Sequence, residues 1–107
     1  MTEQVFSFTK TKEKCIEKLI DHDVAAINHI ILPYKDSVPE HDSNSNVYLI
    51  ITSGIMSAIL NEQPTHEYAA GTILNVPHKT HMKISNQTEG SILEFFIIKA
   101  PSPRLME

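Results

Sequence analysis

Histidine is the residue type that gives this chain most of its chemical potential, because an imidazole can bind a metal ion or transfer a proton near neutral pH. The six histidines are His22, His29, His41, His66, His78 and His81. Each must be weighed against the commoner alternative, a hydrogen-bonded core or surface histidine. His29 alternates with apolar neighbours in a short apolar segment, so its ring could point into a core.

A nucleophilic site is not visible in the sequence. Cys15 is the only cysteine, so it cannot form a disulfide within the chain, and we interpret it as a half-buried structural residue. The sequence has no G-x-S-x-G nucleophile elbow, no phosphate-binding loop and no dinucleotide-binding fingerprint. Whether the protein is an enzyme therefore stays open at this point.

The composition argues against two classes of partner. The formal net charge is −4 and the basic residues form no stripe, which argues against nucleic-acid binding. No apolar run reaches the roughly 18 residues that a membrane span needs, and the N-terminal sequence lacks the apolar centre of a signal peptide. We therefore expect a cytoplasmic protein whose 107 residues form a single domain.

Short apolar segments separated by Gly, Pro and Asn turns predict an all-β sandwich or barrel. The expected strands are 24–32, 47–53, 55–60, 66–68, 72–76, 82–85 and 91–99. Segment 13–20 fits either a helix or a strand, 21–23 is typical of a turn, and 33–46 is expected to be a long loop. We expect residues 1–23 to form an N-terminal arm and residues 24–103 to form the barrel core.

Two of the expected strands are apolar on both faces. In segment 47–53, Val47, Leu49 and Ile51 alternate with Tyr48 and Ile50, and segment 91–99 has the same pattern. An antiparallel sheet with one wet face would show polar residues on that face. Both faces are therefore expected to be covered, one by the barrel interior and the other by a second sheet or subunit, which predicts a homodimer.

The positions of several residues resemble a known family. His41 precedes a strand that ends at Gly54, and Gly71, Pro77 and Asn86 follow. These residues match parts of G-x5-H-x-H-x(3,4)-E-x6-G and G-x5-P-x-G-x2-H-x3-N, the two motifs that describe the cupin superfamily. Over residues 25–103 the chain resembles a small single-domain cupin, which implies a jelly-roll barrel of the double-stranded β-helix type.

The resemblance also implies where a metal would be bound, by three histidines and one carboxylate inside the barrel. In strict register these four positions hold His41, Ser43, Val47 and Met82. Only His41 is a good ligand among them, and a catalytic metal usually has at least three protein ligands, so we expect neither a metal nor another cofactor. If a metal is present, its ligands would be His41 and His81 with His29 or Asn46, which we call the conditional metal set.

The leading hypothesis is a small-molecule-binding protein without a catalytic metal, in which His41 orients the ligand. The expected pocket is lined by His41, Ser43, Val47, Leu49, Ile51 and Met82. One alternative is a metal-dependent enzyme of oxygenase or isomerase type that uses His41 and His81. The other is a structural or regulatory dimer with a filled barrel. The three differ in bound metal and in the volume left inside the barrel.

Overall fold

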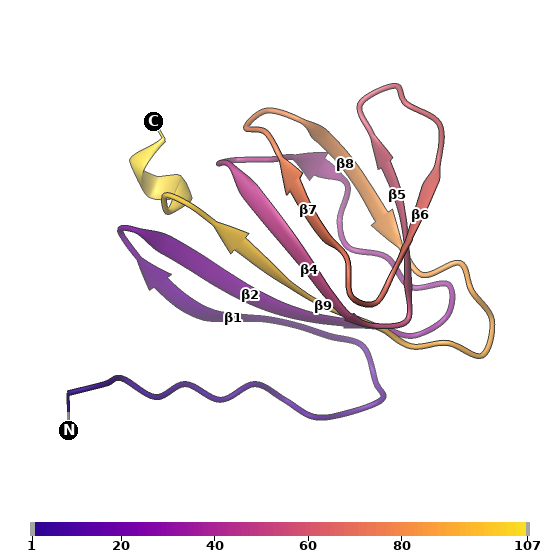
Figure 1. Ribbon diagram of the computed structural model, residues 1–107, viewed down its shortest axis with the longest axis horizontal. Helices are drawn as coiled ribbons and strands as arrows, with labels where there is room; N and C mark the ends of the chain where they lie inside the picture. The colour runs from indigo at the N-terminus through magenta and orange to yellow at the C-terminus, as the bar shows by residue number, and fades with distance from the viewer. Residues whose placement is uncertain (1, 107) are drawn as a thin grey trace.

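The computed structural model describes residues 2–106, which form strands and one short 3-10 helix (Figure 1). The elements are β1 (Cys15–His22), β2 (Ala25–Leu32), β3 (His41–Asp42), β4 (Val47–Ser53), β5 (Ile55–Leu60), β6 (His66–Ala69), β7 (Ile73–Val76), β8 (His81–Ser85), β9 (Leu93–Lys99) and η1 (Pro103–Leu105). The expected all-β fold class is confirmed. Within residues 2–106, no helix has the length and apolar character that crossing a membrane would require.

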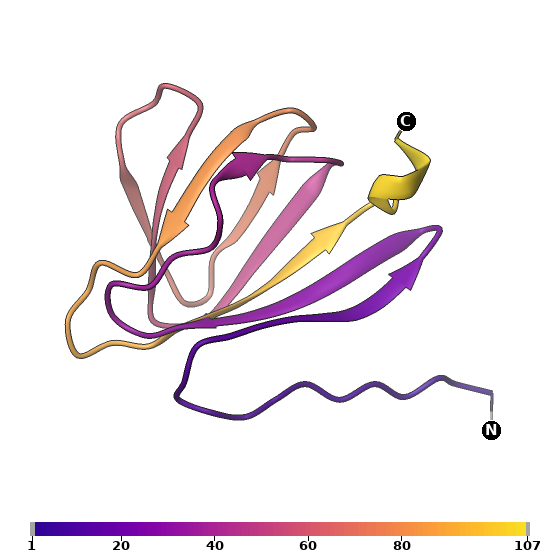
Figure 2. The same cartoon turned by 180° about the vertical axis from the view of Figure 1, so that it is seen from behind.

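The strands form two antiparallel sheets (Figures 1 and 2). Sheet A has the order β1-β2-β9-β4-β7, and sheet B has the order β3-β8-β5-β6. The chain passes repeatedly from one sheet to the other, for example from β4 in sheet A to β5 in sheet B. These crossings close the two sheets around one core, as in a jelly roll.

The hydrophobic core lies between the sheets. On β9, Leu93, Phe95 and Ile97 are buried and alternate with Glu94 and Phe96, because successive side chains of a strand point to opposite faces. Inward-facing residues of the other strands complete the core, together with Val38 of the loop before β3. They are Ile30, Leu32, Val47, Leu49, Ile51, Met56, Ala58, Val76, Met82 and Ile84.

Two residues of the matched motifs have clear structural reasons. Gly54 has a φ of +78° where β4 turns into β5, and a Cβ there would lie 2.4 Å from the carbonyl oxygen of Ile92. No larger side chain fits without a backbone shift. Asn86 is fully buried, and its amide donates hydrogen bonds to the carbonyls of Leu32 and Ser91. These bonds fasten the end of β2 to the chain leading into β9.

Five of the expected strands are shifted by one or two residues at one end, and the larger differences lie before β4. Segment 13–20 resolves as strand β1, which continues to His22, because Asp21 and His22 pair with the start of β2. The turn therefore lies at 23–24 and not at 21–23. Segment 33–46 contains the short strand β3. Since β1 is the edge strand of sheet A, the described N-terminal segment that precedes the sheets is 2–14, whereas the expected arm was 1–23.

Residues 2–14, which we call the arm, form an extended segment beside the outer face of sheet A (Figures 1 and 2). The backbone N–H and the hydroxyl of Thr9 both donate to the carboxylate of Glu17, at 2.9 Å each. The ring of Phe8 packs against His29 and Phe96, with centroid distances of 4.8 and 5.0 Å. The arm thus covers part of the apolar outer face of sheet A.

Candidate functional site

The apolar side chains expected to line a pocket inside the barrel are packed against one another. Val47, Leu49, Ile51 and Met82 are at most 1% exposed and belong to the hydrophobic core. None of the four cavities that we describe over residues 2–106 is lined by any of them. A ligand at these side chains would have to displace packed core atoms, so the interior pocket stays a prediction.

Ser43 lies at the position where the resemblance implies a second histidine, and it has a structural role there. Its hydroxyl donates to the carbonyl of Pro77 at 2.6 Å and accepts the N–H of Thr80 at 2.8 Å. The side chain is 2% exposed. Ser43 therefore connects the end of β3 to the loop before β8, and its hydroxyl proton is donated within the protein and not to a ligand.

His41 and His81 point to opposite faces of sheet B. His41 pairs with Met82, and Asp42 pairs with His81. Met82 enters the core, so the neighbouring His81 faces outward, with 44% of its side chain exposed. Nδ1 of His41 lies 2.8 Å from the carbonyl oxygen of Pro39, which accepts its proton. The two rings therefore do not converge on one metal position.

The other members of the conditional metal set lie elsewhere. His29 is on the outer face of sheet A, where its ring nitrogens contact Glu17 and Glu94, so the expectation that it could point into the barrel is wrong. The side-chain oxygen of Asn46 accepts a hydrogen bond from Asn75 at 2.9 Å. The conditional metal set is therefore not assembled, and a catalytic metal at those residues is not supported.

The largest of the described cavities is a cleft of about 630 Å³, which we call the outer cleft. It lies between the chain entering β1, the loop before β3, and strands β5 and β8. Its charged residues are Lys14, Glu40 and Lys83, its aliphatic residues include Ile16, Val38 and Ile59, and its hydroxyl residues are Ser37, Ser57, Thr65 and Ser85. The lining therefore combines aliphatic surface with charged and hydroxyl groups.

The alternation of side chains along β8 places the cleft outside the barrel. Met82 and Ile84 are buried in the core, so Lys83 and Ser85 point to the opposite face. Strand β5 alternates in the same way, with Ala58 in the core and Ile59 in the cleft. The outward-facing rows of β5 and β8 thus form one side of the outer cleft, and the core residues Val38 and Ile84 also contribute to its lining.

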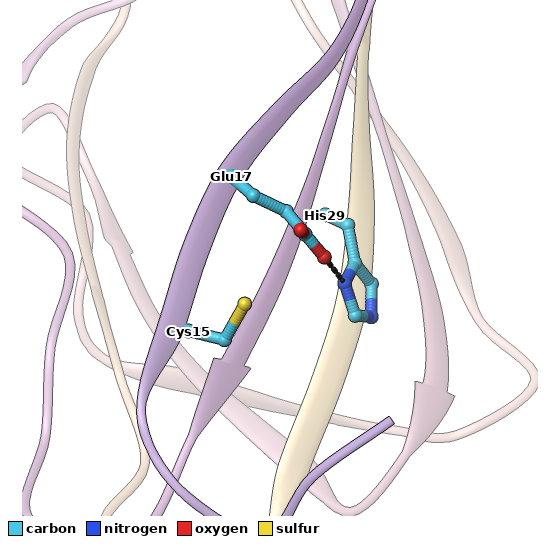
Figure 3. Close-up of side chains that lie close together, drawn as sticks. All are labelled: Cys15, Glu17 and His29. Atoms are coloured by element: carbon cyan, nitrogen blue, oxygen red, sulfur yellow. Dashed lines mark hydrogen bonds and ion pairs between the residues drawn. The ribbon is translucent and has the colours of Figure 1, made fainter. Parts of the chain in front are cut away.

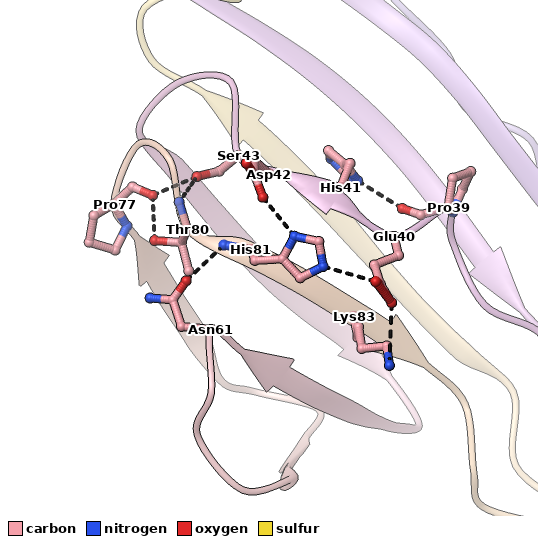
Figure 4. Close-up of polar contacts among 10 residues, drawn as sticks. All are labelled: Pro39, Glu40, His41, Asp42, Ser43, Asn61, Pro77, Thr80, His81 and Lys83. Carbon is pink, nitrogen blue, oxygen red and sulfur yellow. Dashed lines mark hydrogen bonds and ion pairs between the residues drawn. The ribbon is translucent and has the colours of Figure 1, made fainter.

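A chain of charged groups extends from Lys83 and Glu40, which line the outer cleft, to His81 and Asp42 beyond it (Figure 4). His81 bonds to Asp42 through Nδ1 at 2.6 Å and to Glu40 through Nε2 at 2.9 Å. Glu40 also pairs with Lys83 at 3.3 Å. Hydrogen bonding to Glu40, followed by that to Asp42, raises the pKa of His81 above its usual value. Hydrogen bonding to His81, followed by that to Lys83, lowers the pKa of Glu40.

This arrangement is suited to binding charge more than to moving protons. Both ring nitrogens of His81 face carboxylate oxygens, so neither offers a free lone pair to a substrate. Lys14 forms no ion pair within residues 2–106, which leaves its ammonium group available to an anion. Such cations beside aliphatic side chains can hold a ligand that is partly apolar and negatively charged.

Sequence reasoning did not single out Lys14, Ile59 or Lys83 as site residues. The sequence 81–85 does alternate polar and apolar residues, which is a signal for an outward-facing polar row on β8. The meeting of that row with residues near 14 and 37–40 depends on how the sheets pack. No local pattern in the sequence indicates that these segments lie next to one another.

Comparison with known proteins identifies a close relative. No family model matches the sequence. The uncharacterized protein MJ0764 of Methanocaldococcus jannaschii is 44% identical over 105 residues, which cover 97% of this chain and 90% of that protein. A crystal structure of the M. jannaschii protein shows an RmlC-like cupin family protein with a double-stranded β-helix fold. It matches with a TM-score of 0.93 over 99% of this chain and 97% of that one.

Two more distant structures share the same architecture. An uncharacterized conserved protein with a double-stranded β-helix domain from Klebsiella pneumoniae has a TM-score of 0.78 at 12% identity, covering 94% of this chain and 91% of that chain. A cupin superfamily protein from Desulfitobacterium hafniense has a TM-score of 0.73 at 14% identity, covering 90% and 84%. At such identities the likeness shows the fold alone. The fold, together with a cupin relative that is 44% identical over nearly the whole chain, shows that this protein belongs to the cupin superfamily.

Proposed function

We propose that this cupin is a small-molecule-binding protein whose ligand occupies the outer cleft and needs no catalytic metal. The observation that carries the proposal is a cleft of about 630 Å³ on sheet B, while the four apolar residues expected to line an interior pocket are packed into the core. Small-molecule sites typically have volumes of roughly 300–1,000 Å³, so the cleft has room for a ligand of that class.

The lining supports a ligand with an aliphatic body and an anionic group. Ile16 and Ile59 offer apolar surface, Lys14 offers a positive charge outside any ion pair of the described residues, and Lys83 offers one that it shares with Glu40. The hydroxyls of the serines can accept or donate hydrogen bonds to further polar groups of the ligand. We therefore propose a medium-chain carboxylate or a similar amphipathic anion as the ligand class.

A thermal-shift screen of straight-chain carboxylates from butanoate to decanoate tests this proposal, with the corresponding alcohols as uncharged comparisons. The carboxylates are expected to raise the Tm more than the alcohols, because ligand binding to the folded state stabilises it. The effect should weaken at high salt, since the cations of the cleft are partly exposed and screened. Equal shifts for acids and alcohols would contradict the anionic part of the proposal.

Variants then locate the binding site. Lys14→Met should weaken binding of the strongest carboxylate by about tenfold, which corresponds to about 1.4 kcal/mol. Lys10→Met is the matched control, because Lys10 lies in the same arm but does not line the cleft. Calorimetric titration measures both affinities. Unchanged affinity in Lys14→Met, or an equal loss in Lys10→Met, would contradict binding in the outer cleft.

A second observation favours the structural or regulatory dimer. On the outer face of sheet A, Ile73 is 64% exposed and Tyr48 is 37% exposed. The arm adds Val5 and Phe6, which are 72% and 46% exposed. One chain thus carries both an apolar face and an apolar arm, which a two-fold symmetric pair could bury reciprocally. We propose a second copy of this chain as the partner that covers them.

Sedimentation equilibrium tests the dimer over a range of protein concentrations. The protein is expected to be dimeric at micromolar concentration, and Ile73→Lys should dissociate it, because a charge would be buried in an apolar interface. Val24→Lys is the matched control, since Val24 is 79% exposed in the turn between β1 and β2. A monomeric wild-type protein, or equal dissociation by both variants, would contradict the proposal.

A further inference from the structure

Three potential metal ligands of different chemical types meet on the outer face of sheet A (Figure 3). Cys15 and Glu17 are two residues apart on β1, so their side chains point to the same face. His29 lies directly opposite Glu17 on β2. The sulfur of Cys15, the carboxylate of Glu17 and the ring of His29 are drawn pointing toward one another in Figure 3.

The spacing of the donor atoms suits a small tetrahedral ion. One sulfur, one carboxylate oxygen and one ring nitrogen lie within 4.8 Å of one another, and Nδ1 of His29 is 2.7 Å from Oε2 of Glu17. Zinc bonds of normal length place tetrahedral donors about 3.3–3.6 Å apart. The observed separations span this value, so small side-chain rotations, without backbone movement, would bring the three donors to bonding distance.

We propose that Cys15, Glu17 and His29 bind one Zn²⁺ ion on the outer face of sheet A. A thiolate, a carboxylate and an imidazole are all established zinc donors, and a water molecule would complete four-coordination. Binding replaces the proton on the cysteine sulfur and the proton between Glu17 and Nδ1 of His29. Cys15 and Glu17 point to the face of β1 opposite that of Ile16, which lines the outer cleft, so the metal site faces away from the cleft and the proposal does not depend on binding there.

Glu94 orients the histidine for this role. Nε2 of His29 lies 2.7 Å from Oε2 of Glu94, so the ring can donate its remaining N–H to that carboxylate while Nδ1 binds the ion. Metal-binding histidines commonly have such a carboxylate partner, which fixes the tautomer and the ring orientation. His29 is 0% exposed, and the rings of Phe8 and Phe96 pack against it, so its position is fixed by packing as well.

The arm encloses the other side of the cluster. Thr9 donates to both carboxylate oxygens of Glu17 and thereby fixes the orientation of this ligand. Phe8 covers the imidazole at a centroid distance of 4.8 Å. An ion at this site would join β1 to β2 beneath the arm, so we expect it to stabilise the fold and to have no part in chemistry inside the barrel.

Cobalt binding gives the sharpest test, because a Co²⁺–thiolate bond produces a charge-transfer absorption in the near ultraviolet. Untagged, metal-free protein is titrated with Co²⁺ and then with Zn²⁺. We expect the charge-transfer band with Co²⁺, its loss on addition of one equivalent of Zn²⁺, and a higher Tm with Zn²⁺. Cys15→Ser should abolish the band and weaken Zn²⁺ binding at least about tenfold.

Two further variants test whether these three residues, and no others, hold the ion. Glu17→Gln keeps the shape of the side chain and should weaken Zn²⁺ binding while the charge-transfer band persists at higher Co²⁺ concentration. His81→Gln removes the other histidine that lies between two carboxylates and should change neither result. Circular dichroism of each metal-free variant confirms that it is folded. Absence of stoichiometric Zn²⁺ binding, no charge-transfer band in the wild-type protein, or an unchanged affinity in Cys15→Ser would overturn the proposal.

Discussion

The variant Leu49→Ala probes whether the barrel interior is packed or holds an open pocket. Leu49 is 0% exposed and lies on the inner face of β4, within the hydrophobic core. Truncating a buried leucine to alanine removes its apolar contacts and leaves a cavity, at a typical total of roughly 2–5 kcal/mol. Because the surrounding residues belong to rigid strands that can collapse only partly, we expect a loss of about 3 kcal/mol in the free energy of unfolding.

Urea denaturation measures this loss. A small domain has an m-value of roughly 1–3 kcal/mol/M in urea, so a loss of about 3 kcal/mol lowers the midpoint by about 1–3 M. The control is Val24→Ala, at a position that is 79% exposed in the turn between β1 and β2 and outside the proposed dimer interface. We expect this control to change stability by less than about 1 kcal/mol. Protein concentration must be equal in all samples, because a dimer links stability to concentration.

An open pocket at Leu49 would give a different result. Its side chain would then already lack contacts on one side, and truncation would remove far less packing. A loss below about 1 kcal/mol, equal to that of the exposed control, would therefore refute the packed interior. It would return the ligand site to the interior residues expected from the sequence.

Two further predictions concern the turn at Gly54 and the network around His81. Gly54→Ala should strongly lower the Tm in thermal unfolding, because its Cβ would lie 2.4 Å from the carbonyl oxygen of Ile92. The control is Gly90→Ala, which has the same φ of +78° but no atom within 4 Å of its Cβ, so it should show only the smaller cost of a positive φ. Equal losses would show that the close approach of Ile92 is not the cause. Glu40→Gln should lower the pKa of His81, measured by NMR titration, because Glu40 is the main cause of its raised value. A raised pKa in the folded state means that the stabilising contribution of His81 is present at acidic pH and is lost as the pH rises through that raised pKa. An unchanged pKa of His81 in Glu40→Gln would contradict the role of Glu40.

The strands and the family could be predicted from the sequence because their signals are local. The two segments that are apolar on both faces form β4 and β9. The family was indicated by the spacing of Gly54, Gly71, Pro77 and Asn86, which resembles that of the cupin motifs. The ambiguity of segment 13–20 arose because its apolar residues fit both periods. Its pairing with β2 decided for a strand, and that pairing depends on the tertiary structure.

The interior of the barrel was harder to predict. The sequence indicated that three of the four metal positions lack a good ligand, but it left open whether the apolar side chains there line a pocket or fill the barrel. A pocket and a packed core can have the same residue types, because both are lined by apolar side chains. Only the packed arrangement of Val47, Leu49, Ile51 and Met82 distinguishes them.

The cluster of Cys15, Glu17 and His29 depends on one irregularity in the hairpin. Counting back from the pairs next to the turn, such as His22 with Ala25, would place Glu17 opposite Ile30. A shift of register between Lys18 and Ile20 places it opposite His29 instead. Since a one-residue shift moves a side chain to the other face, the sequence pattern alone could not bring these ligands together.

Binding of a ligand in the outer cleft, with the barrel interior still packed, can be observed by methyl NMR. The protein is labelled at isoleucine, leucine and methionine methyl groups, and the strongest carboxylate of the screen is the added ligand. We predict shifts of the Ile16 and Ile59 methyl signals, which belong to the cleft, and no change at Leu49 or Met82, which belong to the core. Shifts confined to Leu49 and Met82 would contradict binding in the outer cleft and place the ligand inside the barrel.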